Sequence, residues 1–321
     1  MSSFTRGPSN VDDLLSSALD KYRNELFEQW AKGNKITKKL FEAGSIREID
    51  GGNDIVEHIN YQAGGTAAWT AKNGTVSVSP SQQFTDAKFK LVMLMGSVVL
   101  YDWEEAQNAG NPKMFGLLEE RMNNLKEEMN QAFQTAALAS STPNANTLWS
   151  LLDIIDSADP SLANYGDIDR DSYTWWASTE TASGSMATQG LEDMRTAYNT
   201  TSREGTDPIG FLVTTQTVYE AYNARLTVHE QLAPTDKGDL EFDSLAFMKK
   251  PLFFSDAMQS GVMLGVNPKH TKLVVNKNMK FKNQPFVRAQ GGINKAAIVQ
   301  LMCQLVCTRP RSNFKLTGLT A

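Results

Sequence analysis

Hydrophobic residues recur at helical spacing near the start of the chain. The stripe is formed by Leu15, Leu19, Tyr22, Leu26 and Trp30. Because consecutive members lie three or four positions apart, they share one face of a helix, and the stripe predicts about five helical turns. The pair Gly33-Asn34 then ends this helix.

A second stripe is longer and gives the clearest element in the sequence. Its members are Phe115, Leu118, Met122, Leu125, Met129, Ala132 and Ala136. With Asn111 as a candidate N-cap and Pro112 in the first turn, the stripe predicts a helix of about 28 residues, more than twice the usual length. The pattern fits either a coiled coil or a long helix that lies on a sheet.

Between these two helices, residues 51–90 carry a different pattern. Glycine pairs and Asn73-Gly74 separate short runs, and Val76 and Val78 alternate with serine, which is typical of strands. We interpret the region as a long β-hairpin with a polar tip, in which Trp69 is the main large hydrophobic side chain. A two-stranded ribbon is only marginally stable alone, so this hairpin needs a partner surface on this chain or on another one.

The rest of the pattern mixes strands and helices. We expect strands within residues 88–101, 209–214, 251–254, 261–265, 272–275 and 294–307, and helices over residues 186–198 and 218–225. Residues 140–146 are rich in Ser, Thr, Pro and Asn and form the best candidate domain boundary. The fold class is therefore α+β, and 321 residues favour two lobes or one lobe with long extensions.

The net charge and the distribution of charged and apolar residues limit the kinds of molecule that this chain can bind. The net charge is −5, whereas proteins that grip nucleic acid through its phosphates usually have a basic excess. Residues 32–47 are mildly basic, which fits either a solvated face or a contact with DNA or a neighbouring subunit. Residues 1–10 lack the apolar core of a secretory signal, and the apolar run 91–101 is too short to span a bilayer. We expect a soluble protein made in a cytoplasm.

Residues that carry chemistry are scarce. The sequence has no phosphate-binding loop, dinucleotide-binding motif or nucleophile elbow, and none of its 3 histidines has a partner at metal-ligand spacing. Asp167, Asp169 and Asp171 resemble the start of a calcium loop but lack its later glycine and glutamate, so we interpret them as a turn. We therefore assign no catalytic, cofactor-binding or metal-binding residue, and we do not expect an enzyme.

Two further features have structural interpretations. Cys303 and Cys307 would lie on one face of a strand, about 13 Å apart at ~3.3 Å per residue, which is too far for a disulfide. We expect both to be reduced thiols in the core. The tandem pair Trp175-Trp176 offers a binding face, but one ring of such a pair more often packs inward.

The order of these elements resembles that of the tailed-bacteriophage major capsid proteins, which have the Hong Kong 97-type fold that encapsulins share. The common order is a helical arm, a long hairpin, a strand-rich stretch, one very long helix, an α/β lobe and a terminal return strand. Four local stretches resemble the family as well, and none is a catalytic motif: residues 165–176 (YGDIDRDSYTWW), 211–220 (FLVTTQTVYE), 251–267 (PLFFSDAMQSGVMLGVN) and 307–314 (CTRPRSNF). The resemblance covers nearly the whole chain.

The resemblance implies a division of labour along the chain. Residues 1–47 would form an N-terminal arm, residues 48–90 an extended loop, residues 91–148 and 290–321 a peripheral domain with the long spine helix, and residues 149–289 an axial domain. Because only about 47 residues precede the loop, we expect a separate scaffolding protein. For such a shell we expect contacts between subunits at Trp30, Trp69, Lys72, Asn73, Gly74 and Val76.

The resemblance also implies a function. The chain would assemble in the host cytoplasm into pentamers and hexamers of an icosahedral virion capsid that encloses double-stranded DNA and contacts it weakly. Its partners would be copies of itself, the scaffolding protein, a portal and decoration proteins, with no cofactor and no membrane. The alternatives are an encapsulin-like compartment with a protein cargo and, from another class, an α/β enzyme with an unrecognised site. An enzyme would form a small, discrete oligomer, whereas a coat protein would form particles.

Overall fold

A computed structural model describes most of the chain. The described residues are 27–52, 54–63, 67, 69–75, 82–101, 103, 107, 111–139, 146–155, 162, 164–202, 205–226, 245–284, 286–288 and 294–320. Leu15, Leu19, Tyr22 and Leu26 of the first predicted stripe and the candidate contact Val76 lie outside the described residues.

The first described element continues the predicted N-terminal stripe. Residues 27–33 are helical. Asn34 follows them and caps the next helix, α2 (Lys35–Glu42), because its side chain accepts a hydrogen bond from the Ile36 amide at 2.8 Å. The prediction that a helix ends at Gly33-Asn34 is confirmed.

The first lobe is built on a six-stranded sheet around one long strand, β15 (Asn294–Cys307). The strands that pair antiparallel with β15 are β4 (Val92–Tyr101), β12 (Thr271–Asn276), β13 (Lys282–Asn283) and β14 (Val287–Arg288). A further strand, β1 (Ile46–Ile49), pairs parallel with β12. The predicted strand over residues 294–307 and the predicted strand-rich stretch 88–101 are confirmed.

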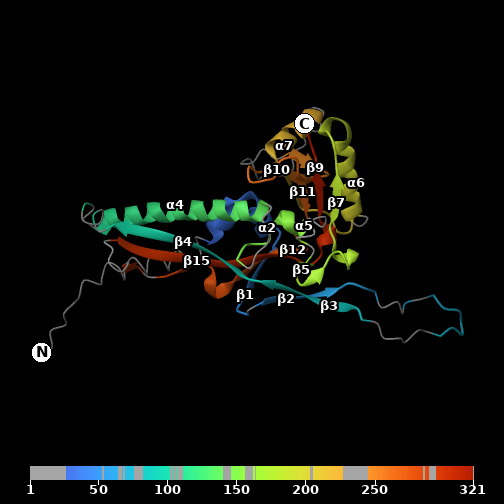
Figure 1. Cartoon of the computed structure of the whole chain (residues 1–321), viewed down its shortest axis with the longest axis horizontal. Coiled ribbons are helices and arrows are strands. Elements are labelled where there is room, and N and C mark those ends of the chain that lie inside the picture. The colour runs from blue at the N-terminus through green and yellow to red at the C-terminus, as the bar shows by residue number, and fades with distance from the viewer. Residues whose placement is uncertain are drawn as a thin grey trace.

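One long helix, α4 (Asn111–Leu138), lies along this sheet and has 28 residues, as predicted (Figure 1). Gly96 of β4 faces it so closely that a Cβ there would lie 2.4 Å from Leu125 Cδ1. The buried side of α4 contains Met122, Leu125, Met129, Phe133 and Ala137. Of the two arrangements that the sequence left open, the structure shows the helix on a sheet.

The predicted stripe is wrong at the C-terminal end of α4. Ala132 is exposed and Ala136 is half-buried, whereas Phe133 and Ala137 are buried. A straight α-helix drifts by about 20° per heptad relative to a strict seven-residue repeat. Over a helix of this length, the contact line therefore moves by one residue, and alanine side chains are left beside it.

The second lobe is built on another six-stranded sheet, in the order β7-β16-β11-β8-β10-β9. Its strands are β7 (Thr179–Ala182), β8 (Phe211–Thr214), β9 (Leu245–Phe247), β10 (Lys250–Phe254), β11 (Met263–Val266) and β16 (Phe314–Thr317). A π-helical turn, η3 (Met186–Gly190), leads into α6 (Leu191–Thr201), and α7 (Gln216–Arg225) follows β8. These elements confirm the helices predicted over residues 186–198 and 218–225. In Figure 1 the lobe rises above the C-terminal end of α4.

Shorter elements complete the chain. They are the hairpin strands β2 (Asp54–Asn60) and β3 (Phe84–Lys90), the helix α5 (Leu151–Ile155), the strands β5 (Asn164–Tyr165) and β6 (Ile168–Asp169), and the 3-10 turns η2 (Thr174–Trp176), η4 (Lys277–Met279) and η5 (Pro310–Ser312). All residues of α5 are buried. This turn is therefore part of the core and not of a surface connection.

The division of the chain into consecutive domains is corrected at two places. The expected axial segment, residues 149–289, also contributes β12, β13 and β14 to the first sheet. The expected peripheral segment, residues 290–321, ends in β16, which pairs with β11 and β7 of the second sheet. The chain thus leaves the second sheet after β11 and returns to it after β15. Contacts between segments distant in sequence decide these pairings, and a local pattern does not report them.

Substitution of glycine by alanine should change the free energy of unfolding in opposite directions at two positions. A Cβ on Gly265 in β11 would lie 2.4 Å from Phe314 Cε1, so Gly265→Ala should lower the free energy of unfolding by about 1–3 kcal/mol. At Gly116 in α4, no atom of the described residues lies within 4 Å of the same position, so Gly116→Ala should raise the free energy of unfolding by about 0.5–1 kcal/mol. Urea unfolding measures both. A Gly265→Ala chain as stable as the original would contradict the packing described.

Candidate functional site

The base of the predicted hairpin is fixed to its own chain. β2 and β3 pair antiparallel, which confirms the hairpin, and their inward side chains alternate with exposed ones. Phe89 on the inner face lies 4.9 Å from Tyr165 between ring centroids. The Lys88 amide donates a hydrogen bond to the Gly166 carbonyl at 3.0 Å. Gly166 has φ +65°, and a Cβ there would lie 2.7 Å from Phe89 Cζ, so glycine is needed for this contact.

Polar and aromatic contacts extend this attachment along the hairpin. Glu57 is buried on the inner face and forms an ion pair with Arg47 at 2.5 Å. Tyr61, directly after β2, stacks on Trp175 with ring centroids 5.1 Å apart. Trp176 is buried, and its indole donates to the Tyr165 carbonyl at 2.8 Å. The prediction that one ring of the tandem pair packs inward is confirmed.

The hairpin tip lies beyond these contacts. Residues 69–75 are all exposed, and Trp69 has a relative exposure of 105%. The Gly74 amide donates to the Ala71 carbonyl at 2.8 Å, so Lys72 and Asn73 occupy the centre of the turn. The predicted turn centred on Asn73-Gly74 is therefore wrong by one residue. The expected contacts Trp69, Lys72, Asn73 and Gly74 lie in one exposed segment, residues 69–75, which contains this turn.

Trp30 is not available to a neighbouring subunit, which corrects the expectation for this residue. Its side chain is 0% exposed. The ring packs edge-on against Phe133 at 4.9 Å and Phe281 at 5.7 Å between centroids, with Phe27 at 5.8 Å. An apolar helical stripe that carries a tryptophan looks the same in sequence whether it faces a core or an interface. Here it faces the core.

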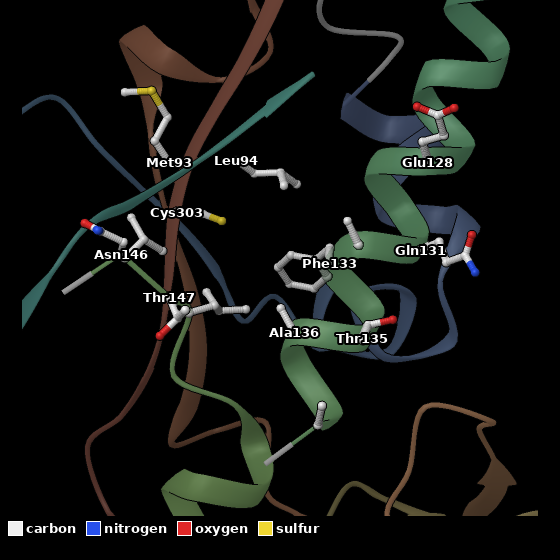
Figure 2. Close-up of a pocket in the computed structure, with 14 residues that line it drawn as sticks. Met93, Leu94, Glu128, Gln131, Phe133, Thr135, Ala136, Asn146, Thr147 and Cys303 are labelled. Atoms are coloured by element: carbon white, nitrogen blue, oxygen red, sulfur yellow. The ribbon is translucent and has the colours of Figure 1, made fainter. Parts of the chain in front are cut away.

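A groove of about 660 Å³ lies between α4 and the strands β4 and β15 (Figure 2). Phe133 and Ala136 project into it from α4, and Leu94 and Cys303 face them from the two strands. Its other lining residues come from the same elements and from the segment after α4: Val92, Met93, Glu128, Gln131, Ala132, Thr135, Ala139, Asn146, Thr147 and Leu148. The groove is therefore mainly apolar, with polar side chains along the rim formed by α4.

Sequence reasoning missed this groove, although a signal for it exists. Ala132, Ala136 and Ala139 recur at helical spacing at the end of α4, and all three line the groove. Small side chains at these positions leave space between the helix and the sheet. The predicted stripe instead places Ala132 and Ala136 on the buried face of the helix, where they would have closed the space.

The described residues contain no group of three or more His, Cys, Asp or Glu side chains placed to hold a metal ion. At the candidate calcium loop, Asp169 instead accepts hydrogen bonds from the Asp171 amide at 3.0 Å and the Ser172 hydroxyl at 2.5 Å. The bond from Ser172 contributes most to lowering the pKa of Asp169. The interpretation of these residues as a turn is confirmed.

Among the helices of the described segments, none combines the length and the apolar character that crossing a lipid bilayer requires.

Both cysteines are free and buried, as predicted. Burial raises the pKa of Cys303 to about 12. Burial also raises the pKa of Cys307, although a hydrogen bond from Thr271 partly opposes the shift. Because the thiolate is the reactive form, we expect a thiol reagent at pH 8 to label neither cysteine in the folded chain and both after unfolding. Rapid labelling of the native chain, followed by absorbance, would show that this prediction is wrong.

The chain is similar to known proteins in structure, whereas its sequence gives no match. The sequence matches no protein-family model and no curated protein. The fold is similar to the capsid asymmetric unit of cyanophage A-1(L), with a TM-score of 0.66 and 11% identity over 87% of this chain and 91% of that chain. It is also similar to the capsid of a native GTA particle, with a TM-score of 0.60 and 10% identity over 88% and 91% of the two chains.

A third similar structure is a virus-like particle from Pyrococcus furiosus, with a TM-score of 0.54 and 13% identity over 92% of this chain and 98% of that chain. In all three comparisons the match runs through both lobes, because it covers most of each chain. The hairpin, the long helix on its sheet and the second α/β lobe follow the order expected from the sequence. The chain therefore has the Hong Kong 97-type fold of tailed-bacteriophage major capsid proteins.

Proposed function

We propose that this chain is the major capsid protein of a tailed bacteriophage, a shell-building subunit that binds copies of itself. One observation carries the proposal: Trp69 is completely exposed on a tip that extends past the last contacts between the hairpin and its own chain. Burying a tryptophan removes roughly 150–250 Å² from water, so a side chain held in this way favours contact with another molecule. The capsid fold of the similar structures supports the same conclusion.

We further propose that the groove beside α4 receives this tip from a second copy. Its volume of about 660 Å³ is ample for an indole ring. The floor beside Leu94 and Phe133 is apolar, and Glu128 on the rim would complement Lys72 of the tip. The hairpin points away from α4 of its own chain (Figure 1), so its tip would reach the groove of a neighbour.

A contact between tip and groove joins two different surfaces of identical chains. Such a head-to-tail contact closes into a ring when the rotation between copies permits it. We propose that these rings are the pentamers and hexamers of an icosahedral shell. Many modest contacts then add up to a stable particle. The fixed base sets the direction of the hairpin, and the tip carries the adaptable part of the contact.

The shell would enclose double-stranded DNA and bind it only weakly. The net charge is −5, and the exposed face of α4 carries Glu119, Glu120, Glu127 and Glu128, which repel phosphates. A separate scaffolding protein, a portal and decoration proteins are proposed as further partners, with assembly in the host cytoplasm and a final location in the virion capsid.

Negative-stain electron microscopy of the full chain, expressed alone and together with its neighbouring genes, tests the proposed function. We expect closed shells, or rings that become shells when a scaffolding protein is present. Particles that contain a protein cargo in place of DNA would favour the compartment alternative. A chain that stays monomeric or dimeric under both conditions would rule out the shell function and favour an enzyme.

A further inference from the structure

Asp207 is a buried carboxylate that belongs to neither of the proposed assembly surfaces. It precedes β8 in the second lobe and is 5% exposed. Its Oδ2 atom lies 2.5 Å from Nε2 of His270 and 3.2 Å from Nη1 of Arg309. Its Oδ1 atom accepts a hydrogen bond from the Asn267 amide group at 3.2 Å and lies 3.5 Å from Nζ of Lys269.

These partners lie where the chain passes from one lobe to the other. Asn267, Lys269 and His270 form the connection between β11 of the second sheet and β12 of the first. Arg309 lies between β15 of the first sheet and β16 of the second. One carboxylate of the second lobe therefore contacts both of these crossings.

A second set of buried polar contacts ties the two crossings to each other. The side chain of Asn313 accepts a hydrogen bond from the Asn267 amide at 2.7 Å and donates to Thr271 Oγ1 at 3.4 Å and to Cys307 Sγ at 3.3 Å. The Thr308 amide donates to the His270 carbonyl at 3.0 Å. Asn267 and Asn313 are almost completely buried, so opening this junction would leave polar groups without partners until water reached them.

We infer that the Asp207 cluster is a proton-linked clasp between the two lobes, closed at neutral pH and opened when His270 takes up a proton. In the closed clasp His270 is neutral, and its Nε2–H donates to Asp207, because a carboxylate only accepts. A proton on the second ring nitrogen would place a further positive charge beside Arg309 and Lys269, with a single carboxylate among them.

The direction of the linkage follows from the two titrating groups. Burial lowers the pKa of His270, Arg309 and Lys269 lower it further, and the hydrogen bond to Asp207 opposes them without cancelling them. In an open junction the histidine regains its usual pKa near 6.5. Opening therefore takes up a proton below about pH 6.5, and the closed form loses stability as the pH falls toward the lowered pKa.

Asp207 acts in the same direction but at lower pH. Burial raises its pKa, yet the hydrogen bonds from His270 and Asn267 outweigh this effect, and the pKa is lowered. The carboxylate thus stays ionised in the closed clasp and loses its charge only in stronger acid. The histidine step comes first when the pH is lowered from neutral.

Hydrogen exchange of the full-length chain tests the clasp. Protection of the backbone amides in residues 266–271 and 307–313 should fall by up to about tenfold per pH unit below pH 6.5, because opening is linked to one proton. In His270→Gln this pH dependence should disappear, since the amide keeps a donor but does not titrate. Asp86→Asn is the matched control, because it breaks an exposed histidine–aspartate pair on the hairpin, far from the junction in sequence. Its junction amides should behave as in the original chain.

A second measurement uses the original chain, so it does not require that any variant folds. In the histidine NMR spectrum of the original chain, one of the 3 histidine signals should titrate below the usual histidine range. An unchanged pH dependence in a folded His270→Gln chain would overturn the clasp. So would a spectrum in which every histidine titrates in the usual range. Neither result would bear on shell formation, which is read from particles.

Discussion

Trp69→Ala is expected to abolish the assembly of rings and shells while the monomer stays folded. The side chain has no cover within the described part of its own chain, so its removal should leave the unfolding free energy unchanged. At an interface, truncating a central tryptophan costs about 2 kcal/mol or more, which weakens each contact about 30-fold. The loss is repeated at every subunit of a ring. Sedimentation and electron microscopy should therefore detect no particles.

Trp103→Ala is the matched control, because Trp103 is also exposed, at 72%, but lies outside the hairpin and the groove. A chain with Ala132→Trp, which fills the groove from its exposed rim, should fail to assemble as well. Mixing the Trp69→Ala and Ala132→Trp chains should yield one-to-one dimers, since one chain retains the groove and the other retains the tip. Normal shells from either variant alone would exclude the contact between tip and groove.

Trp30→Ala should act on folding, in contrast to Trp69→Ala, which should act on assembly. Of the substitutions proposed, we expect it to cause the largest loss of stability. The indole is completely buried and packs against three phenylalanine rings, so its removal leaves a cavity between the N-terminal helical segment, α4 and the first sheet. Such truncations cost about 3–5 kcal/mol. Urea unfolding should show this loss, and soluble expression should fall.

Trp30→Phe separates packing from hydrogen bonding at the same site. The indole nitrogen of Trp30 is buried and has no hydrogen-bond partner among the described residues, so phenylalanine gives up none of the hydrogen bonds that the structure describes. We expect it to restore most of the stability that alanine loses. If Trp30→Ala unfolded like the original chain but failed to assemble, Trp30 would be an interface residue after all.

Local patterns in the sequence predicted the elements of this fold well. The long stripe marked α4 because a helix on a sheet buries one continuous face. An apolar run marked β15, whose C-terminal part, residues 303–307, is buried on both faces. The pair Gly33-Asn34 marked the end of the first helix. In each case the residues of the segment itself determine the element that forms, so the local sequence is enough to predict it.

The predictions that were wrong concern contacts between segments that are distant in sequence. The sequence did not show that β16 pairs in the second sheet or that β12 pairs in the first, because partners distant in sequence decide these pairings. It did not separate Trp30 in the core from Trp69 at the tip, since both are large aromatic residues in plausible contact segments. The groove depends on a small drift of the contact line along α4, which a strict repeat conceals.

The path of the chain through the two sheets also determines when the protein can fold during synthesis. β15, at the centre of the first sheet, and β16, within the second, follow in sequence all the described strands with which they pair. Neither sheet can be completed before the ribosome reaches this segment, so most of the chain waits with its apolar faces uncovered. A chain that stops before β15 would lack the centre of one sheet and an inner strand of the other. We therefore expect such a truncated chain to remain unfolded.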